Sequence, residues 1–182
     1  AREIMGMGLN KLGYSLNDSN PSHIKRAEVD LKKLAPQVRG VVGDEITMML
    51  QQNEGNIAVV WSGVAAPLVQ NSNKYDYVIP KEGSNLWFDN MVIPKTAQNK
   101  EGAYKFMNFL LDKKNNKQNT EWVGYATPNK AARDKLPKEI REDHRFYPTN
   151  KEQKRLEVYK DLGQQTLSEY NESFLNFKMT LK

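Results

Sequence analysis

Two residues in the middle of the chain, Trp87 and Asp89, have side chains that suit an organic cation. They follow a turn rich in Gly, Ser and Asn, and alternation along an extended segment would place them on one face. An indole face attracts positive charge, and a carboxylate accepts charge-assisted hydrogen bonds from an ammonium group. The same residues also fit a half-buried Trp beside a solvated turn Asp, so both interpretations stay open.

Two further aromatic residues are predicted at positions where ligands bind. Trp61 ends the apolar run 57–61, which is typical of a strand buried on both faces and leads into a turn and a helix through Gln70. Open α/β sheets bind ligands at the carboxyl ends of their strands, although a Trp there can also simply fill the end of the sheet. Tyr125 lies in the loop 122–129, which a Gly and a Pro interrupt. With the acidic Glu3, such a set would bind amines without transforming them.

The sequence gives no support for catalytic chemistry. It contains no Gly-x-Ser-x-Gly elbow and no glycine-rich loop that would cradle a phosphate. The absence of Cys excludes thiol nucleophiles, and His23 and His144 are too few and too far apart for a usual histidine metal site. We therefore expect a protein that is not an enzyme and that has neither a metal site nor a cofactor.

Length and charge limit the classes of partner. The 182 residues suffice for one well-packed domain, or for one domain and part of another. The net charge of +5, from 27 basic and 22 acidic residues, is dispersed and forms no basic block with interleaved aromatics, so a nucleic acid partner is not expected. No run reaches the length of a membrane span, and the first residues lack the layout of a secretion signal, so a secreted origin would require an upstream part.

Hydrophobic periodicity predicts an alternation of helices and strands. Helices are expected at 1–13, at 24–34 up to Pro36, after a capping Asp44, at 62–70, at 99–111 with an apolar stripe facing a sheet, at 112–121, and beyond residue 150 with a break near Gly163. Strands are expected at 57–61, 75–79 and 91–93. The fold class is therefore α/β, most simply a three-layer sandwich, and so few strands indicate a fragment.

Several ordered motifs carry a resemblance to a known family. They are Glu54-Gly55-Asn56, Val60-Trp61-Ser62-Gly63, Pro80-Lys81-Glu82-Gly83, Trp87-Phe88-Asp89, Asn99-Lys100-Glu101-Gly102-Ala103 with Phe109-Leu110-Leu111, and the run Gly-Tyr-Ala-Thr-Pro-Asn-Lys-Ala-Ala-Arg at 124–133. In this order and spacing the chain resembles the carboxyl-terminal half of the spermidine/putrescine-binding protein of polyamine ABC transporters. The resemblance runs from Ala1 to about Gly163.

The resemblance implies a fold, an activity and a location. The fold would be a fragment of the periplasmic-binding-protein-like (type II) class, with residues 1–87 plus 134–182 in the carboxyl-terminal lobe and 88–133 in the amino-terminal lobe, whose remainder is absent. The whole protein would capture a polyamine and deliver it to a membrane permease. It would act outside the cytoplasm, in the periplasm or at the cell surface, with membrane association through parts not present in this chain.

The resemblance also implies six ligand-binding residues. Three rings would form walls around the ligand, two carboxylates would bind its amino groups, and Tyr159 takes the place of a family glutamine that touches the ligand. These residues are Trp61, Trp87 and Tyr125, then Glu3 and Asp89, and Tyr159. A third family carboxylate would precede Ala1 and so lie outside this sequence.

Two alternatives to polyamine capture stay open. The chain could bind another small organic cation, or it could be a sensor or interaction domain that keeps the scaffold without the ligand. We further expect residues 1–182 alone to self-associate, because apolar sheet surface and a strand edge would be uncovered.

Overall fold

The computed structural model describes residues 1–181, and the chain divides into two compact units. Unit 1 consists of Ala1–Ala58, Ile79–Trp87 and Asn150–Lys182, and unit 2 consists of Val59–Val78 and Phe88–Thr149. Segments distant in sequence therefore build each unit. One passage of the chain from unit 1 to unit 2 falls between Trp87 and Phe88, within the motif that carries two of the predicted ligand residues.

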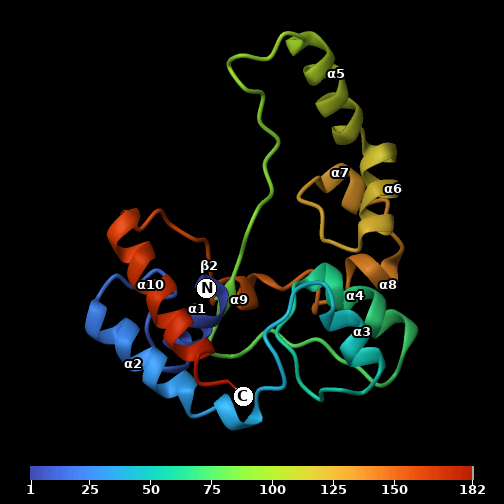
Figure 1. Ribbon diagram of the computed structural model, residues 1–182. Coiled ribbons are helices and arrows are strands. Elements are labelled where there is room, and N and C mark those ends of the chain that lie inside the picture. Colours follow the sequence, from blue (N-terminus) through green and yellow to red (C-terminus); the bar gives the residue numbers. More distant parts are fainter. Residues whose placement is uncertain (182) are drawn as a thin grey trace. The chain divides into compact units, whose positions relative to one another are not determined.

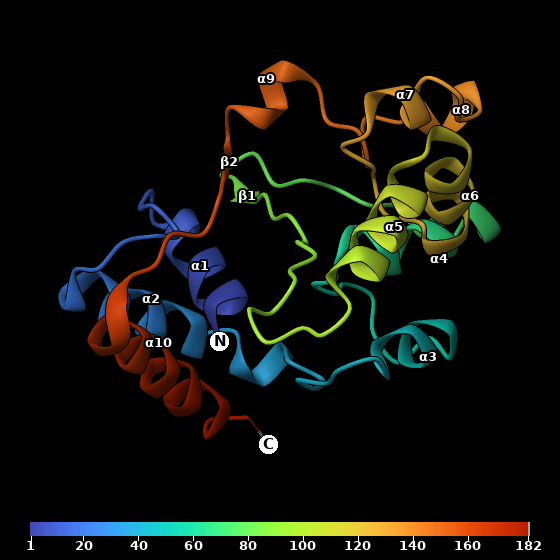
Figure 2. The same ribbon diagram turned by 90° about the horizontal axis from the view of Figure 1, so that it is seen from above.

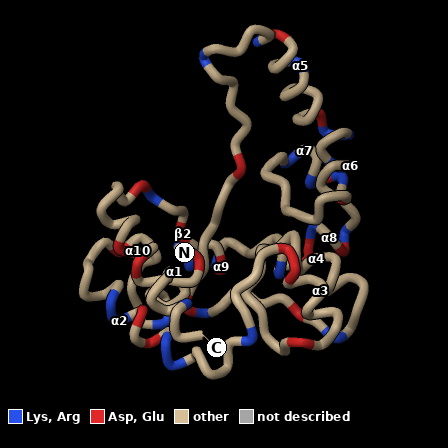
Figure 3. The backbone as a smooth tube through the Cα atoms, in the orientation of Figure 1, with Lys and Arg blue, Asp and Glu red and all other residues tan. Residues whose placement is uncertain are grey.

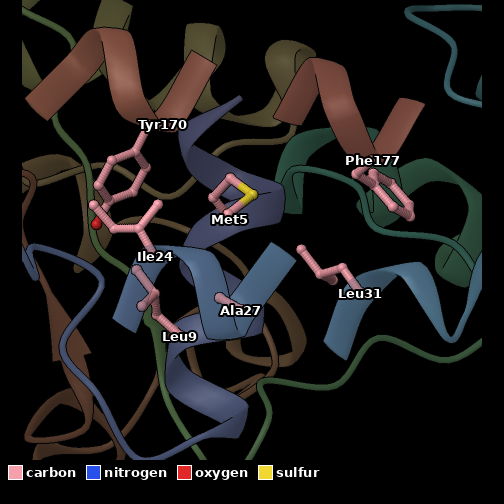
Figure 4. Close-up of a cluster of buried hydrophobic side chains, with 7 residues drawn as sticks. All are labelled: Met5, Leu9, Ile24, Ala27, Leu31, Tyr170 and Phe177. Atoms are coloured by element: carbon pink, nitrogen blue, oxygen red, sulfur yellow. The ribbon is translucent and has the colours of Figure 1, made fainter. Parts of the chain in front are cut away.

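Unit 1 is organised around three helices that pack side by side, α1 (Arg2–Lys11), α2 (Pro21–Lys32) and α10 (Gly163–Lys178) (Figures 1 and 2). Their apolar faces meet in one buried cluster (Figure 4). Its members are Met5, Leu9, Ile24, Ala27, Leu31, Tyr170 and Phe177. The spacing of these residues is that of helices with one apolar face, so burial of the shared cluster stabilises the packing of all three.

Local signals explain where the first two helices begin and end. Helix α1 starts at Ala1 without a capping side chain, as predicted, and Gly13 just beyond it has the left-handed φ of 80° that a glycine accommodates best. Helix α2 starts after Asn20, whose side chain accepts a hydrogen bond of 3.0 Å from the backbone of Ser22, with Pro21 at the first position. Both predicted helices are thus confirmed.

The remaining elements of unit 1 are short. They are the 3₁₀-helix η1 (Ala35–Gln37), α3 (Ile46–Gln51), α9 (Asn150–Gln153) and two strands, β1 (Ser84–Asn85) and β2 (Leu156–Glu157). The strands pair in parallel, with Ser84 opposite Leu156 and Asn85 opposite Glu157. The prediction that Asp44 caps α3 is wrong, because the capping position is Glu45 and its side chain makes no capping hydrogen bond.

Unit 2 contains the helices α4 (Ser62–Asn71), α5 (Lys100–Leu111), α6 (Lys113–Val123), α7 (Lys130–Arg133) and α8 (Lys138–Arg141). Asn99 caps α5 by accepting a hydrogen bond of 2.8 Å from the Gly102 backbone, and Asp112 caps α6 at the Lys114 backbone. Helix α6 ends at Gly124, whose left-handed φ is 77°. The helices predicted at 62–70, 99–111 and 112–121 are therefore confirmed.

The apolar stripe of α5 is not covered by a sheet, contrary to the prediction. Phe106 is 59% exposed, and none of the α5 residues is buried. The periodicity that predicted the helix also predicted its burial against a sheet. Residues 1–181 provide no sheet there, and the contact of α5 with α6 leaves Ala103, Met107 and Leu110 only half-buried.

The predicted strands at 57–61, 75–79 and 91–93 do not form, and with them the three-layer sandwich is not built by the described residues. Residues 1–181 form mainly helices with one small sheet, β1–β2. A strand exists through hydrogen bonds to a neighbouring strand, and within the described part of the chain these segments have no such neighbour. Ile57 is 93% exposed, as expected for a strand-like segment without its sheet.

Charged side chains are spread over both units rather than gathered (Figure 3). Many of them pair locally, as in the ion pairs Lys105–Glu101 and Lys130–Asp134, each at 2.7 Å. This dispersal agrees with the prediction from composition. Among the helices formed by residues 1–181, none combines the length and the apolar character that crossing a membrane requires.

Candidate functional site

Two predicted ligand residues, Trp87 and Tyr159, occupy equivalent positions after the paired strands of unit 1. Trp87 lies two residues beyond Asn85 of β1, and Tyr159 lies two residues beyond Glu157 of β2, which is the partner of Asn85. The Leu86 amide donates a hydrogen bond of 2.9 Å to the Glu157 carbonyl, so the pairing continues toward them. Carboxyl ends of parallel strands are where α/β proteins bind ligands, and this edge presents two half-buried aromatic residues.

The segment that carries Tyr159 is fixed by the side chain of Asn17. The Asn17 amide nitrogen donates to the Val158 carbonyl at 3.0 Å, and its oxygen accepts from the Lys160 backbone amide at 2.8 Å. The residues on both sides of Tyr159 are therefore held by one side chain. The Glu157 carboxylate adds hydrogen bonds from the hydroxyl of Ser15 and the backbone amide of Leu16.

Arg2 lies over the ring of Tyr159. Its guanidinium carbon is 4.3 Å from the ring centroid, a cation–π geometry. The same guanidinium donates to the Lys160 carbonyl at 2.8 Å and to the Asn17 oxygen at 2.9 Å. One face of the Tyr159 ring is thus already occupied by a cation, so the hydroxyl and the opposite face are what Tyr159 can offer to a ligand.

The Tyr159 hydroxyl stays protonated at physiological pH. Burial raises the pKa of this phenol far above its ordinary value, the nearby negative charge of Glu3 raises it further, and Arg2 lowers it only in part. Glu3, in the first turn of α1, and Tyr159 are therefore close enough to interact electrostatically. The unit 1 part of the predicted set combines a carboxylate, a neutral phenol and an indole.

In unit 2, Trp61 and Tyr125 meet the same turn of α4. Trp61 is the residue immediately before the helix, and it is 52% exposed at the end of the unpaired segment rather than at the end of a strand as predicted. Tyr125 follows the left-handed Gly124 that ends α6, and its ring packs against Gly63 in the first turn of α4. The predicted strand end is wrong, because Trp61 follows a segment without a strand partner in the described part of the chain and occupies the amino-terminal capping position of α4.

Tyr125 also has an aromatic neighbour that the sequence analysis did not single out. Burial raises the pKa of Tyr77, and Tyr125 raises it further, which places the two phenols within electrostatic range of each other. The Tyr77 ring stacks on Phe146 with centroids 5.4 Å apart. A sequence signal existed, because alternation along 75–79 places Tyr77 on the half-buried side of an extended segment.

Asp89 is exposed and belongs to unit 2, whereas Trp87 belongs to unit 1. The predicted side-by-side pairing of these two residues therefore stays a prediction. Within the units, the structure brings Glu3 near Tyr159 and places Trp87 and Tyr159 two residues after the partners Asn85 and Glu157. It also brings Trp61 and Tyr125 to one turn of α4. Arg2, Asn17 and Gly63 are supporting residues that only the tertiary structure identifies.

Residues 1–181 hold no group of three or more His, Asp or Glu side chains placed to bind a metal ion. The candidate residues of the two units carry rings, carboxylates and one half-buried phenol.

A family model described as bacterial extracellular solute-binding protein matches residues 1–148. The chain belongs to this family. The family is one of solute-binding proteins, which confirms the prediction of a binding protein rather than an enzyme.

Individual relatives are more specific. The chain is 42% identical over 163 residues to the spermidine/putrescine-binding periplasmic protein of Escherichia coli, an alignment that covers 90% of this chain and 47% of that protein. It is 31% identical over 187 residues to a putrescine/cadaverine-binding protein of Pseudomonas aeruginosa, covering 98% of this chain and 52% of the relative. The resemblance inferred from the motifs is confirmed.

Solved structures share the fold. A protein described as a spermidine/putrescine ABC transporter from Listeria monocytogenes is 56% identical, with a TM-score of 0.90, and the match covers 98% of this chain and 55% of that one. The substrate-binding protein PotD of Streptococcus pneumoniae is 45% identical, with a TM-score of 0.89 and coverage of 100% and 56%. The fold is therefore that of part of a PotD-like periplasmic binding protein.

The chain spans about half the length of the curated relatives it matches. These relatives are periplasmic or extracellular solute-binding proteins.

Proposed function

We propose that the protein to which these residues belong is the polyamine-capturing component of an ABC importer. It binds spermidine or putrescine outside the cytoplasm, in the periplasm or at the cell surface, and delivers the ligand to a membrane permease. The observation that carries the proposal is the edge after β1 and β2, where Trp87 and Tyr159 each follow two residues beyond a pair of strand partners and Glu3 lies near Tyr159. The polyamine ligands of the named relatives support it.

The six residues named above have different roles in ligand recognition, which follow from their side-chain chemistry. A polyamine carries ammonium groups separated by methylene chains, so it needs carboxylates at intervals and apolar walls between them. Glu3 and Asp89 supply the carboxylates, and the rings of Trp61, Trp87 and Tyr125 supply the walls and cation–π attraction. The neutral Tyr159 side chain offers one hydroxyl and a ring, where the amide that it replaces offers a carbonyl acceptor and two N–H donors.

The complete protein on this proposal has the type II organisation, a three-layer α/β sandwich in each lobe. Residues 1–87 plus 134–182 contribute to the carboxyl-terminal lobe, and 88–133 to the amino-terminal lobe. The exposed extended segments at 57–61 and 91–93 support it, because they have the apolar composition of strands without having a partner in the described part of the chain.

Residues 1–182 in isolation are expected to self-associate. Ile57 and Val92 on unpaired segments and Trp122 on the surface of α6 are each more than four-fifths exposed, and large exposed apolar groups favour association. Light scattering on the purified fragment should give a mass above that of one chain, rising with concentration. A constant monomer mass up to high concentration would contradict this expectation.

A thermal-shift panel on the full-length protein tests the proposed function. A ligand that binds only the folded state raises the melting temperature with its concentration, and we expect this for spermidine and putrescine. Tetramethylammonium and arginine represent other organic cations, and glucose and glutamate serve as negative controls. A shift with arginine or tetramethylammonium alone would favour a different cation binder, and no shift with any compound would favour the sensor or interaction domain.

A further inference from the structure

The buried residues at the start of α4, where the Tyr125 ring packs, are all small. Gly63, Ala65 and Ala66 are buried there. Glycine within a helix is unfavourable relative to alanine, so a buried helical glycine needs a reason. Gly63 does not have the left-handed φ that would require glycine for the backbone itself.

The ring of Tyr125 supplies the reason. A Cβ added to Gly63 would lie 2.5 Å from both Cδ2 and Cζ of Tyr125 and against Cε2 as well. Ordinary contacts of a Cβ begin at about 3.4 Å, so the ring would have to move by roughly 1 Å to accept even one methyl group. The atoms in contact are those of a rigid ring, so no flexible end of a side chain can absorb this movement.

The residue before Tyr125 also lies close to α4. Gly124 ends α6 with a left-handed φ of 77°, and a Cβ there would lie 3.5 Å from the Gly63 carbonyl oxygen and 3.6 Å from the Ala66 Cβ. The chain therefore turns at the end of α6, next to the small residues of α4, and Tyr125 follows with its ring against Gly63. The left-handed φ of Gly124 turns the chain at this point, and the missing side chain of Gly63 leaves room for the ring that follows.

We propose that Gly63 is a positioning residue for ligand binding, and that its missing side chain sets the place of the Tyr125 ring in the polyamine site. This inference rests on the proposed function, because it needs Tyr125 to be a ligand contact. Gly63 itself does not touch the ligand. Its effect on affinity passes entirely through the ring that it accommodates.

A double-mutant cycle on the full-length protein tests this. Gly63→Ala, Tyr125→Ala and the double variant are titrated with spermidine by calorimetry, with Gly55→Ala as the matched control, since a Cβ at Gly55 meets no atom within 4 Å. We expect Gly63→Ala to raise the dissociation constant about tenfold, as Tyr125→Ala does, from a lost ring contact. In the Tyr125→Ala background, Gly63→Ala should change it by less than about twofold.

Several results would overturn the proposal. An equal loss of affinity from Gly63→Ala in both backgrounds would mean that Gly63 acts without Tyr125, and an unchanged affinity would mean that the ring position does not matter. If Gly63→Ala alone does not fold, the double variant, in which the ring is absent, remains the test, and it must fold and bind as Tyr125→Ala does.

The ring position is measured separately in the ligand-free protein. The NMR signals of the Tyr125 ring, identified with Tyr125→Phe, should shift in Gly63→Ala and stay in place in Gly55→Ala. Unmoved ring signals in Gly63→Ala would overturn the proposal whatever the ligand is. If the ring signals shift in Gly63→Ala but the wild-type protein binds neither spermidine nor putrescine, the failure lies in the proposed function and not in the role of Gly63.

Discussion

Replacing Asp89 by Asn in the full-length protein is expected to weaken spermidine binding about 10- to 150-fold, which corresponds to about 1.5–3 kcal/mol. Asparagine keeps the shape of the side chain but removes the charge that accepts hydrogen bonds from an ammonium group. Asp89 is exposed, so its carboxylate is open to a ligand. Calorimetric titration of the variant measures the change directly.

The control for Asp89 is an exposed aspartate elsewhere. Asp44→Asn removes the same charge from the loop before α3, and we expect it to leave the dissociation constant unchanged. Trp87→Ala tests the neighbouring ring and should weaken binding at least as much as Asp89→Asn. Unchanged affinity in both Asp89→Asn and Trp87→Ala would rule out that these two side chains bind an ammonium group of the ligand.

Replacing Glu28 by Gln is expected to lower the free energy of unfolding by about 1–3 kcal/mol, although Glu28 is not part of the site. Its side chain is 1% exposed, in α2, beneath Lys25 at 2.9 Å and Lys32 at 2.7 Å. Glutamine leaves both lysines without their buried charge partner. Glu101→Gln is the matched control, because its ion pair with Lys105 joins side chains that are 80% and 76% exposed and should contribute less than about 0.5 kcal/mol.

The effect of Glu28 should depend on pH with a definite sign. Burial by itself raises the pKa of Glu28, but hydrogen bonds and charges from Lys25 and Lys32 outweigh burial and leave the pKa below its ordinary value. A lowered folded-state pKa gives stability that is complete above the unfolded pKa of about 4.3 and is lost as the pH falls further.

The difference in unfolding free energy between wild type and Glu28→Gln should therefore be constant between about pH 6 and 8 and shrink below about pH 4. Urea unfolding at a series of pH values measures it. A difference that grew on acidification would contradict the assignment of the buried charge.

The helices could be predicted from the sequence because apolar spacing and capping residues lie within one short stretch of chain. Helix α5 has its apolar spacing and its cap at Asn99 within one stretch of chain, and α6 has Asp112 before it and Gly124 after it. Such signals say where a helix begins and ends. They do not say what covers it, which is why the exposed Phe106 was predicted to be buried.

The strands could not be read in the same way, because a strand is defined by its partner. The apolar runs 57–61 and 75–79 have strand composition and remain unpaired, whereas the sheet that does form joins polar residues at 84–85 to residues 156–157, 72 positions away. No local pattern at Ser84 or Asn85 indicates that pairing.

The sequence predicted which types of side chain the candidate site contains, but not which residues hold those side chains in position. Ring and carboxylate types, together with the family motifs, pointed to Trp61, Tyr125 and Glu3. The Asn17 side chain that fixes the Tyr159 segment and the bare Gly63 beneath Tyr125 come from contacts between residues more than sixty positions apart in the sequence. Only the folded chain brings such residues together.

The most direct test of polyamine capture compares putrescine with butane-1,4-diol in calorimetric titrations of the full-length protein. The two molecules have the same four-carbon chain, and only putrescine carries ammonium groups that carboxylates and ring faces can recognise. We predict saturable binding of one putrescine per protein and no saturation with the diol at the same concentrations. Binding of the diol with an affinity similar to that of putrescine, or saturation by neither compound, would contradict the account.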